Sequence, residues 1–265
     1  LNEGRGSAVA AQVVGAKSDT FGMSDAGSLM LAVSKGMPIR SVFTLLSSSD
    51  FAIISLEESG IRSPKDLEGK SVAVSAGDAL TQLFPAVIEA NRLDKDRIRL
   101  VFMDPPAKPV ALMEKRVDAL LGGASDQFWL VKYKGFKPAR MMFAEIGVDT
   151  VGMTIHAHTD TLKENPDLVR RFIKATIRSW EAARQDPAAA ARAAQKVKPD
   201  LNVSSTEDQL RTNLSQLHSK NSQGKSIGYS APEDWEHTLV LLKKYRDLQT
   251  DKPATFFYTS EYMPK

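Results

Sequence analysis

The sequence predicts an α/β fold, and the order of its apolar runs is the main reason. Short runs rich in β-branched residues, typical of strands, recur at residues 51–56, 71–75, 98–103, 118–123 and 151–158. Helix-like segments separate most of them, and alternating strands and helices favour largely parallel sheets. After about residue 160 the pattern becomes almost purely helical. We therefore expect a strand-rich first part and a helical C-terminal part.

Length and composition narrow the class of protein. A chain of 265 residues can form one large domain or two lobes. The net charge is only +3 and the basic residues are scattered, which argues against a nucleic-acid surface. No apolar run approaches the roughly 20 residues of a membrane span. The absence of cysteine excludes thiol nucleophiles, cysteine zinc sites and disulfides. It suits an exported protein, and also many cytosolic ones.

The first element is a glycine turn before a helix. Gly4, Arg5, Gly6 and Ser7 precede the alanine-rich run AVAAQVV. Free N–H groups at a helix start, with a serine hydroxyl beside them, suit a sulfonate, carboxylate, phosphate or ring carbonyl. The turn lacks the third glycine of a dinucleotide fingerprint and the Gly-Lys-Ser/Thr of a P-loop. Ligand contact and a plain N-cap turn both remain open.

A pattern that follows this helix recurs about a hundred residues later. In each copy a helix leads to a basic turn, an aspartate, a short apolar strand, a glycine and a Ser-Asp pair. The pairs are Ser24-Asp25 and Ser125-Asp126, displaced by two residues between the copies. Chance similarity is one explanation, but we favour two lobes of similar topology. Ligands of open α/β sheets bind at the carboxyl ends of strands, where both pairs are predicted to lie.

The helical part carries clear start signals. A proline after a capping residue predicts helices that begin at residues 166 and 187, the second ending near 197. Ser205 or Thr206 begins another helix, and Ser230 with Glu233 forms a capping box for the last one. Apolar residues at helical spacing predict buried stripes on the first and last of these helices: Leu168, Val169, Phe172, Ile173, Ile177 and Trp180, then Trp235, Leu239, Leu242 and Tyr245.

Several segments together resemble a known family. They are NEGRGS, KSDTFGMSDAGSLMLAVSKGMPIRSV, GIRSPKDLEGKSVAVSAGDA, ALMEKRVDALLGG and TLKENPDLVRRFIKAT. These segments are similar to the ABC-transporter substrate-binding proteins for nitrate, sulfonate, taurine and thiamine-pyrimidine precursors, and to the pyrimidine synthases related to them. The resemblance covers most of the chain.

The resemblance implies a bilobed, Venus-flytrap periplasmic-binding-protein fold of type II. Lobe I would comprise residues 1–50 and 152–265, and lobe II, residues 51–151, would be inserted into it. Two hinge crossovers are expected, near residues 49–54 and 148–153. Family members carry a strand and a helix before the EGxGS element, so lobe I is expected to be incomplete here. The ligand would bind between the lobes, which close on it by hinge bending.

The resemblance also implies the ligand contacts. Carried over by position, they are Gly6, Ser7, Ser24, Asp25, Ser47, Ser48, Gly77, Asp78, Ala79, Asp104, Ser125 and Asp126. Turn or cap chemistry is the alternative for the serines, and for Asp104 a helix-start turn. The acidic residues at the strand ends favour a neutral heterocycle or an amine-bearing ligand over a sulfonate or nitrate. We expect no cofactor.

Enzymatic and regulatory functions are the alternatives. The pyrimidine synthases share the fold, but their cysteine-rich motif cannot be present in a chain without cysteine. His156 and His158 alternate on one predicted strand, yet no third metal ligand is apparent nearby. A sensor lobe would normally carry a DNA-binding or membrane segment. We therefore expect a monomeric solute-binding protein, not an enzyme, that delivers a small-molecule ligand to an ABC permease. It would be periplasmic or lipid-anchored, and made with a signal peptide.

Overall fold

The computed structural model describes residues 6–264, and its contacts divide the chain into two compact units. The first unit comprises the residues up to Ser49, Thr150–Pro187, and those from Leu214 onward. The second comprises Asp50–Asp149 and Ala188–Asn213. The chain leaves and re-enters the first unit within the two ranges expected for crossovers, and then does so once more. Residues 188–213 therefore belong to the second unit, whereas the family resemblance places them in lobe I.

The sheet of the first unit has three strands in the order β1-β8-β2. They are β1 (Phe21–Asp25), β2 (Ile39–Thr44) and β8 (Met153–His158). Both pairings are antiparallel, so the expectation of largely parallel sheets is wrong for this unit. The reason is topological: β8 enters from the second unit and lies between β1 and β2, running opposite to both.

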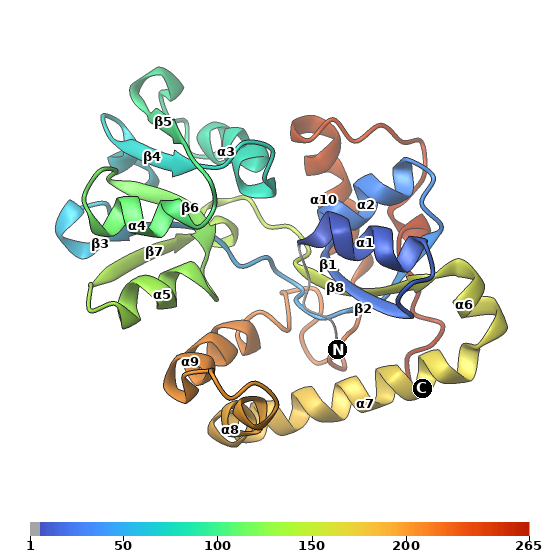
Figure 1. Ribbon diagram of the computed structural model, residues 1–265. Helices are drawn as coiled ribbons and strands as arrows, with labels where there is room; N and C mark the ends of the chain where they lie inside the picture. Colours follow the sequence, from blue (N-terminus) through green and yellow to red (C-terminus); the bar gives the residue numbers. More distant parts are fainter. Residues whose placement is uncertain (1–5, 265) are drawn as a thin grey trace. The chain divides into compact units, whose positions relative to one another are not determined.

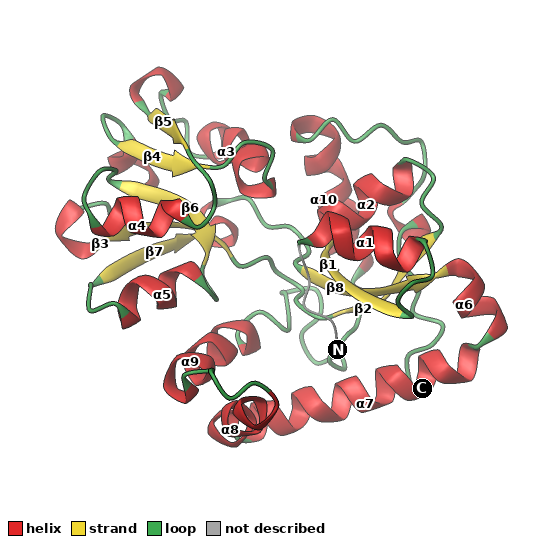
Figure 2. Ribbon diagram, in the orientation of Figure 1, coloured by secondary structure: helices red, strands yellow, loops and turns green. Residues whose placement is uncertain are grey.

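Helices cover both faces of this sheet (Figure 1, Figure 2). One core contains Leu29, Met30, Trp235 and Leu239, and it packs α1, α2 and α10 together. A separate core contains Phe43, Ile155 and the buried stripe of α7. The helices of this unit are α1 (Ser7–Gly15), α2 (Ala26–Ser34), α6 (Thr159–Glu164), α7 (Pro166–Gln185) and α10 (Pro232–Tyr245).

The sheet of the second unit has five strands in the order β5-β4-β6-β3-β7. Their bounds are β3 (Phe51–Leu56), β4 (Ser71–Val74), β5 (Arg99–Phe102), β6 (Ala119–Gly123) and β7 (Pro138–Met142). Strand β4 pairs in parallel with β5 and β6, while β3 is antiparallel to β6 and β7. This sheet is therefore mixed. The sequence analysis did not predict β7, whose burial pattern is irregular.

Helices also flank this second sheet. A core of Ile54, Ala73, Leu120 and Val131 packs α4 and α5 against the strands (Figure 1), and α3 packs against β6. The helices are α3 (Ala79–Ala90), α4 (Ala107–Met113), α5 (Gln127–Tyr133), α8 (Pro187–Val197) and α9 (Val203–Leu214), of which α8 begins at the last residue of the first unit. Short 3-10 helices occur at Glu57–Ser59, Pro64–Leu67, Lys95–Arg97, Phe143–Ile146 and Ala254–Phe256.

The helix-start signals of the C-terminal part are mostly correct. Helices α7 and α8 begin at their predicted prolines, and α9 begins two residues before Ser205 because the Asn202 side chain accepts the Ser205 N–H. The capping box predicted for Ser230 and Glu233 at the start of α10 is wrong. The Ser230 hydroxyl is hydrogen-bonded to the Thr44 hydroxyl at 2.6 Å, and the N-cap of α10 is Ala231.

The predicted stripes are largely buried. Val169, Ile173 and Ile177 of α7, and Trp235, Leu239 and Leu242 of α10, lie in the core. Leu168 differs, because it is exposed at the start of α7. Tyr245 at the end of α10 is half-buried.

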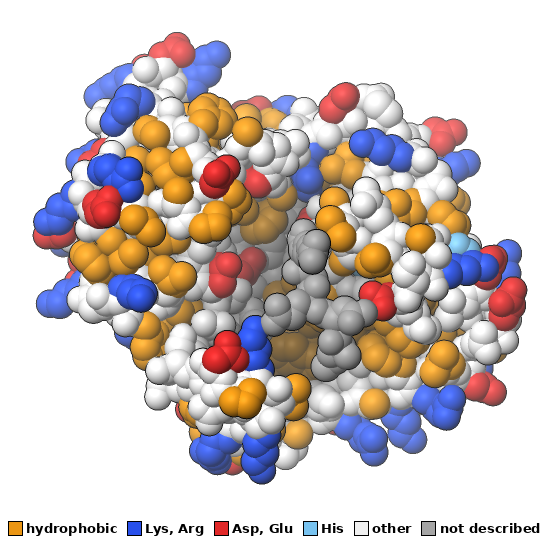
Figure 3. All heavy atoms as spheres, in the orientation of Figure 1, with side chains coloured by type: hydrophobic (Ala, Val, Ile, Leu, Met, Phe, Trp, Pro, Cys, Tyr) orange, Lys and Arg blue, Asp and Glu red, His pale blue; other side chains and the backbone are white. Residues whose placement is uncertain are grey.

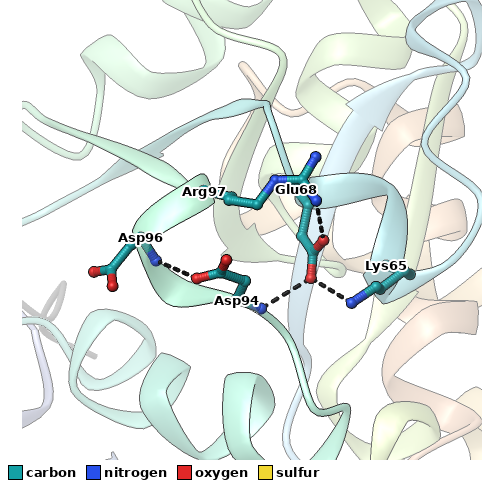
Figure 4. Close-up of polar contacts among 5 residues, drawn as sticks. All are labelled: Lys65, Glu68, Asp94, Asp96 and Arg97. Carbon is teal, nitrogen blue, oxygen red and sulfur yellow. Dashed lines mark hydrogen bonds and ion pairs between the residues drawn. The ribbon is translucent and has the colours of Figure 1, made fainter.

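The family-like stretch SPKDLEGKSVAV leads into β4 and is held by Glu68 (Figure 4). The Glu68 carboxylate accepts hydrogen bonds from Lys65 Nζ at 2.6 Å, Arg97 Nη1 at 2.9 Å and the Asp94 N–H at 2.8 Å. The hydrogen bond from Lys65, followed by that from Asp94, holds the pKa of Glu68 below its usual value. These contacts join the turns before β4 and β5, so the motif positions two strands of the sheet.

The surface carries both signs of charge. Lys and Arg side chains are interspersed with Asp and Glu on the visible face, without a basic stripe (Figure 3). Among the helices between residues 6 and 264, none combines the length and the apolar character needed to cross a bilayer.

Candidate functional site

One edge of the second sheet collects four chain segments. Strands β4, β5 and β6 run parallel and end there, and β3 begins there because it is antiparallel to β6. Phe51 of β3 lies opposite Gly123 of β6, and the Ala124 N–H donates to the Asp50 carbonyl at 2.8 Å. Residues separated by more than 70 positions in the sequence therefore meet at the edge where α/β proteins bind ligands.

A pocket of about 350 Å³ opens at this edge. Its charged lining residues are Asp50, Asp78, Lys108 and Asp126. A second pocket, of about 510 Å³, shares the lining residues Asp78 and Pro105 with the first and therefore adjoins it. It is also lined by Ser75, Ala76, Gly77, Phe102, Met103 and Asp104. We call these two adjoining pockets the acidic groove.

Asp78 lies where the two pockets meet. Its Oδ1 accepts the Thr81 N–H at 2.6 Å and caps α3. The preceding Gly77 has φ of +75°, a conformation that glycine adopts without strain. Ala79 begins α3 and is half-buried. Asp104 lines the wider pocket, and its backbone carbonyl accepts the Ala107 N–H at the start of α4. The structure therefore brings Gly77, Asp78 and Asp104 together and gives Asp78 a capping role as well.

Lys108 is the cation of the groove, and its ammonium faces the protein interior. Its side chain is only 2% exposed. The Nζ donates to the Leu121 carbonyl at 2.6 Å and lies 3.4 Å from Asp78 Oδ2. A buried ammonium needs such partners, because moving it out of water without a hydrogen-bond partner would cost several kcal/mol. The charge of Lys108 is thus directed at groups of the protein itself.

Two carboxylates flank Gly123 at the end of β6. A β-carbon on Gly123 would collide with Asp126 Oδ1 and Asp50 Oδ2, so both carboxylates lie against this glycine. Asp50 accepts the Ser125 hydroxyl, and Asp126 accepts the Gln127 N–H and caps α5. Although Asp126 reaches solvent, loss of hydration raises its pKa, and the nearby charge of Asp50 acts in the same direction.

The first unit has its own polar edge at the end of β1. The Ser7 hydroxyl accepts the Asp25 N–H at 3.1 Å, so these two predicted residues meet. Asp25 caps α2 by accepting the Ser28 N–H at 2.9 Å, and it lies 3.7 Å from Arg246 Nη1. Gly6 is exposed as the N-cap of α1. Gly4 and Arg5 of the opening turn lie outside the described residues.

Ser24 and Ser47 are in the interior of this unit. Ser24 is fully buried, with its hydroxyl 3.2 Å from His156 Nδ1. Ser47 is also buried, and its hydroxyl donates to the Leu217 carbonyl at 2.9 Å. Ser48 is half-buried, and its N–H lies 3.5 Å from the Gln216 carbonyl. The hydroxyls of Ser24 and Ser47 therefore serve the packing of the first unit.

The two alternating histidines have separate structural roles. His156 is fully buried on β8, and burial lowers its pKa from 6.5 to about 4. His158 caps α6, its Nδ1 accepting the Asp160 N–H at 3.0 Å. Over the part of the chain that the structure describes, no three His, Asp or Glu residues are grouped as metal ligands.

The predicted ligand contacts omit several residues that line the acidic groove. Asp50, Lys108 and Gln127 line the narrower pocket, and Phe102 lines the wider one. A signal existed for Asp50, because it directly precedes a predicted strand and follows three serines. None existed for Lys108, because only the packing of α4 turns its side chain inward.

Comparison with known proteins gives a family and a fold. The family model described as NMT1/THI5 like matches residues 1–190, which is more than half of the chain. Among curated proteins, the riboflavin-binding protein RibY of Chloroflexus aurantiacus is 20% identical over 250 residues, covering 92% of this chain and 70% of RibY.

The solved structures share the fold at low identity. The alkanesulfonate-binding protein SsuA of Xanthomonas axonopodis pv. citri, bound to MOPS, matches with a TM-score of 0.72 and 15% identity, over 97% of this chain and 86% of SsuA. The aliphatic sulphonate binding protein SsuA of Escherichia coli matches with a TM-score of 0.75 and 14% identity, over 96% of this chain and 80% of that SsuA. The desulfurization enzyme DSZB matches with a TM-score of 0.61 and 15% identity, over 92% of this chain and 84% of DSZB. The expected periplasmic-binding-protein fold is thereby confirmed.

Proposed function

Because the chain belongs to the NMT1/THI5-like family, we propose that it is the solute-binding component of an ABC importer. It captures a small organic molecule outside the cytoplasmic membrane, in the periplasm, and delivers it to a membrane permease. The names of RibY and the two SsuA proteins, which bind riboflavin and sulfonates, support this function class.

The observation that carries the proposal is the acidic groove. It lies where three parallel strands end, is large enough for a small organic molecule, and is lined by polar groups from four chain segments. The contacts that we assign to this unit all line the groove: Gly77, Asp78, Asp104, Ser125 and Asp126. In the first unit Ser7 and Asp25 form a second candidate surface, for which Ser7→Ala is the test variant.

The desulfurization enzyme among the structural relatives raises an enzymatic alternative. A general acid or base must reach the reacting group by a hydrogen bond. None of the four histidines lines the acidic groove, and His156, although it titrates, has its ring in the interior of the first unit. The groove therefore offers no histidine as an acid or base, and we favour binding without chemistry, in line with the names of RibY and the two SsuA proteins.

Ligand-dependent stabilisation tests the proposal. The purified chain is screened by thermal shift against several hundred small solutes, and mass spectrometry identifies any molecule released on denaturation. A solute at a thousand times its dissociation constant adds about 4 kcal/mol to the free energy of unfolding. A hit whose stabilisation is reduced in Asp50→Asn but not in Asp96→Asn supports capture at the groove. Absence of any hit, with nothing released, contradicts the proposed function.

A further inference from the structure

Lys108 is a lysine in the interior of the second unit, beside the acidic groove. It is the second residue of α4, and only 2% of its side chain is exposed. A lysine is almost never buried to this degree unless its charge is paired. The groups that surround its ammonium therefore indicate what the charge does.

The ammonium joins the end of β6 to the start of α3. The Nζ donates to the carbonyl of Leu121, near the end of β6, at 2.6 Å. It also lies 3.4 Å from Asp78 Oδ2, whereas Oδ1 of the same carboxylate accepts the Thr81 N–H at 2.6 Å. One oxygen of Asp78 thus caps the helix, and the other faces Lys108.

Three carboxylates share the narrower pocket with this ammonium. Asp50, Asp78 and Asp126 line it together with Lys108. Asp50 and Asp126 both lie against Gly123 and therefore repel each other. Repulsion between two carboxylates favours the uptake of a proton by one of them, and a positive charge beside them has the opposite effect.

Two further charged residues lie near this edge of the sheet. Asp104 lines the wider pocket. Arg140 of β7 donates from Nη1 to the Ala124 carbonyl at 3.2 Å, and its guanidinium lies over the ring of Phe128. Arg140 is therefore directed at a backbone carbonyl and an aromatic ring, whereas Lys108 is directed at a carboxylate of the groove.

Opposing effects act on the carboxyl group of Asp126. Loss of hydration raises its pKa, and the charge of Asp50 adds to this rise, whereas the hydrogen bond from the Gln127 N–H and the charge of Lys108 lower the pKa. An ionised carboxylate only accepts hydrogen bonds, but a protonated one also donates. The protonation state of Asp126 therefore determines what the groove presents to a solute.

We propose that Lys108 is a positioning residue whose buried ammonium, held between Asp78 and the end of β6, keeps the carboxylates of the acidic groove ionised to a lower pH. Without this charge the carboxylates at Gly123 would bind a proton at a higher pH, and the groove would then present a donor among its acceptors. The role in binding rests on the proposed function, but the effect of the charge is measured without a solute.

A carboxyl NMR titration of the ligand-free chain tests the proposal. The aspartate carboxyl carbons are isotope-labelled, and Asp126→Asn identifies the resonance of Asp126. In Lys108→Met, and in Lys108→Gln, which keeps a donor for the Leu121 carbonyl, we expect the pKa of Asp126 to rise, with a proton affinity about three- to tenfold higher, because a nearby opposite charge is lost. Lys115→Met is the control. Lys115 pairs with Glu58 between exposed side chains, and its loss should leave the titration unchanged.

A measurement on the unaltered chain does not depend on whether the Lys108 variants fold. The nitrogen resonance of the Lys108 ammonium should shift at the titration midpoint of Asp126, and this shift should disappear in Asp126→Asn. An unchanged Asp126 titration in both Lys108 variants, or an ammonium resonance that does not respond, overturns the inference and makes Lys108 only a structural link between α4 and β6. Because no solute is present, that result leaves the proposed function intact, which only the solute screen contradicts.

Discussion

At the scale of single residues, polar side chains at strand ends act first as structural parts. Asp25, Asp78 and Asp126 each cap the helix that follows their strand. An aspartate at this position stabilises the helix start through its N–H groups, whether or not a ligand binds. The groove residues therefore combine two roles, and only those with acceptor capacity to spare can also serve a solute.

His156 gives a prediction on pH dependence. Burial lowers its pKa in the folded protein from 6.5 to about 4, so between these values the unfolded chain binds protons more strongly. The contribution of His156 to stability is therefore constant above pH 6.5 and is lost as the pH falls, by about 3 kcal/mol near pH 4. Urea unfolding as a function of pH measures it.

The control for this prediction is the exposed His237. We expect His156→Gln to flatten the fall in unfolding free energy between pH 6.5 and 4, whatever its effect at neutral pH. His237→Gln should keep the wild-type slope, which also includes the protonation of carboxylates. Equal slopes in both variants would show that His156 titrates normally.

At the scale of elements, the turns that join strands and helices determine where the site residues lie. Asp25 is the N-cap of α2, and Asp78, which follows Gly77, is the N-cap of α3. Glu68 lies just before β4, and its carboxylate accepts the Asp94 N–H, which holds the beginning of that strand in place. The hydrogen bonds of these turns therefore position the strand ends and helix starts at the edge where a solute would bind.

The capping role of Asp25 can be separated from its ion pair. Asp25→Ala removes the oxygen that accepts the Ser28 N–H, and we expect a loss of about 1 kcal/mol in unfolding free energy. Asp25→Asn keeps a capping oxygen and removes only the charge that faces Arg246. Chemical denaturation should show the smaller loss for Asn. Equal losses for Asn and Ala would assign the main role of Asp25 to the ion pair.

The hydrogen bonds of Glu68 predict that two alanine variants of acidic residues differ in stability. Glu68→Ala removes three hydrogen bonds at once, including one to the backbone, whereas Glu58→Ala removes an ion pair with Lys115 between two exposed side chains. Because exposed pairs contribute little, the melting temperature should fall clearly more for Glu68→Ala. Because the folded pKa of Glu68 is lowered, its contribution should disappear on acidification. Equal melting temperatures would contradict a joining role.

At the scale of the whole molecule, the order of the helices along the chain does not match the units to which they belong. Helices α8 and α9 follow α7 of the first unit in sequence, yet residues 188–213 belong to the second unit. Trp129 Nε1 donates to the Thr212 hydroxyl at 2.8 Å, and the Tyr133 hydroxyl donates to Asp208 at 3.0 Å. These two contacts from α5 hold α9 in the second unit.

Hydrogen exchange tests this assignment. Trp129→Phe keeps most of the apolar surface and removes one hydrogen bond, worth about 1 kcal/mol. We expect faster amide exchange in residues 203–214, with the first unit unchanged. Trp180→Phe, on α7 in the first unit, is the control and should leave 203–214 as in the wild type. Unchanged exchange in Trp129→Phe would mean that other contacts hold α9.

Local sequence signals were sufficient to predict the α/β class, most strands and most helix starts. Apolar periodicity, prolines after capping residues and Ser-Asp pairs are local signals, so they can be read without knowing the fold. The family resemblance was also visible in contiguous segments, and residues 1–190 match the family model.

Which polar residues are accessible, and which face one another, depends on contacts between distant parts of the chain. Ser24 and Ser47 are buried, Lys108 points inward, and Asp50 meets Asp126 across 76 positions of sequence because β3 pairs with β6. The same holds for the antiparallel sheet of the first unit, for the mixed sheet of the second, and for the second-unit membership of residues 188–213. These features depend on strand pairing and side-chain packing between distant segments, and such contacts leave no local pattern in the sequence.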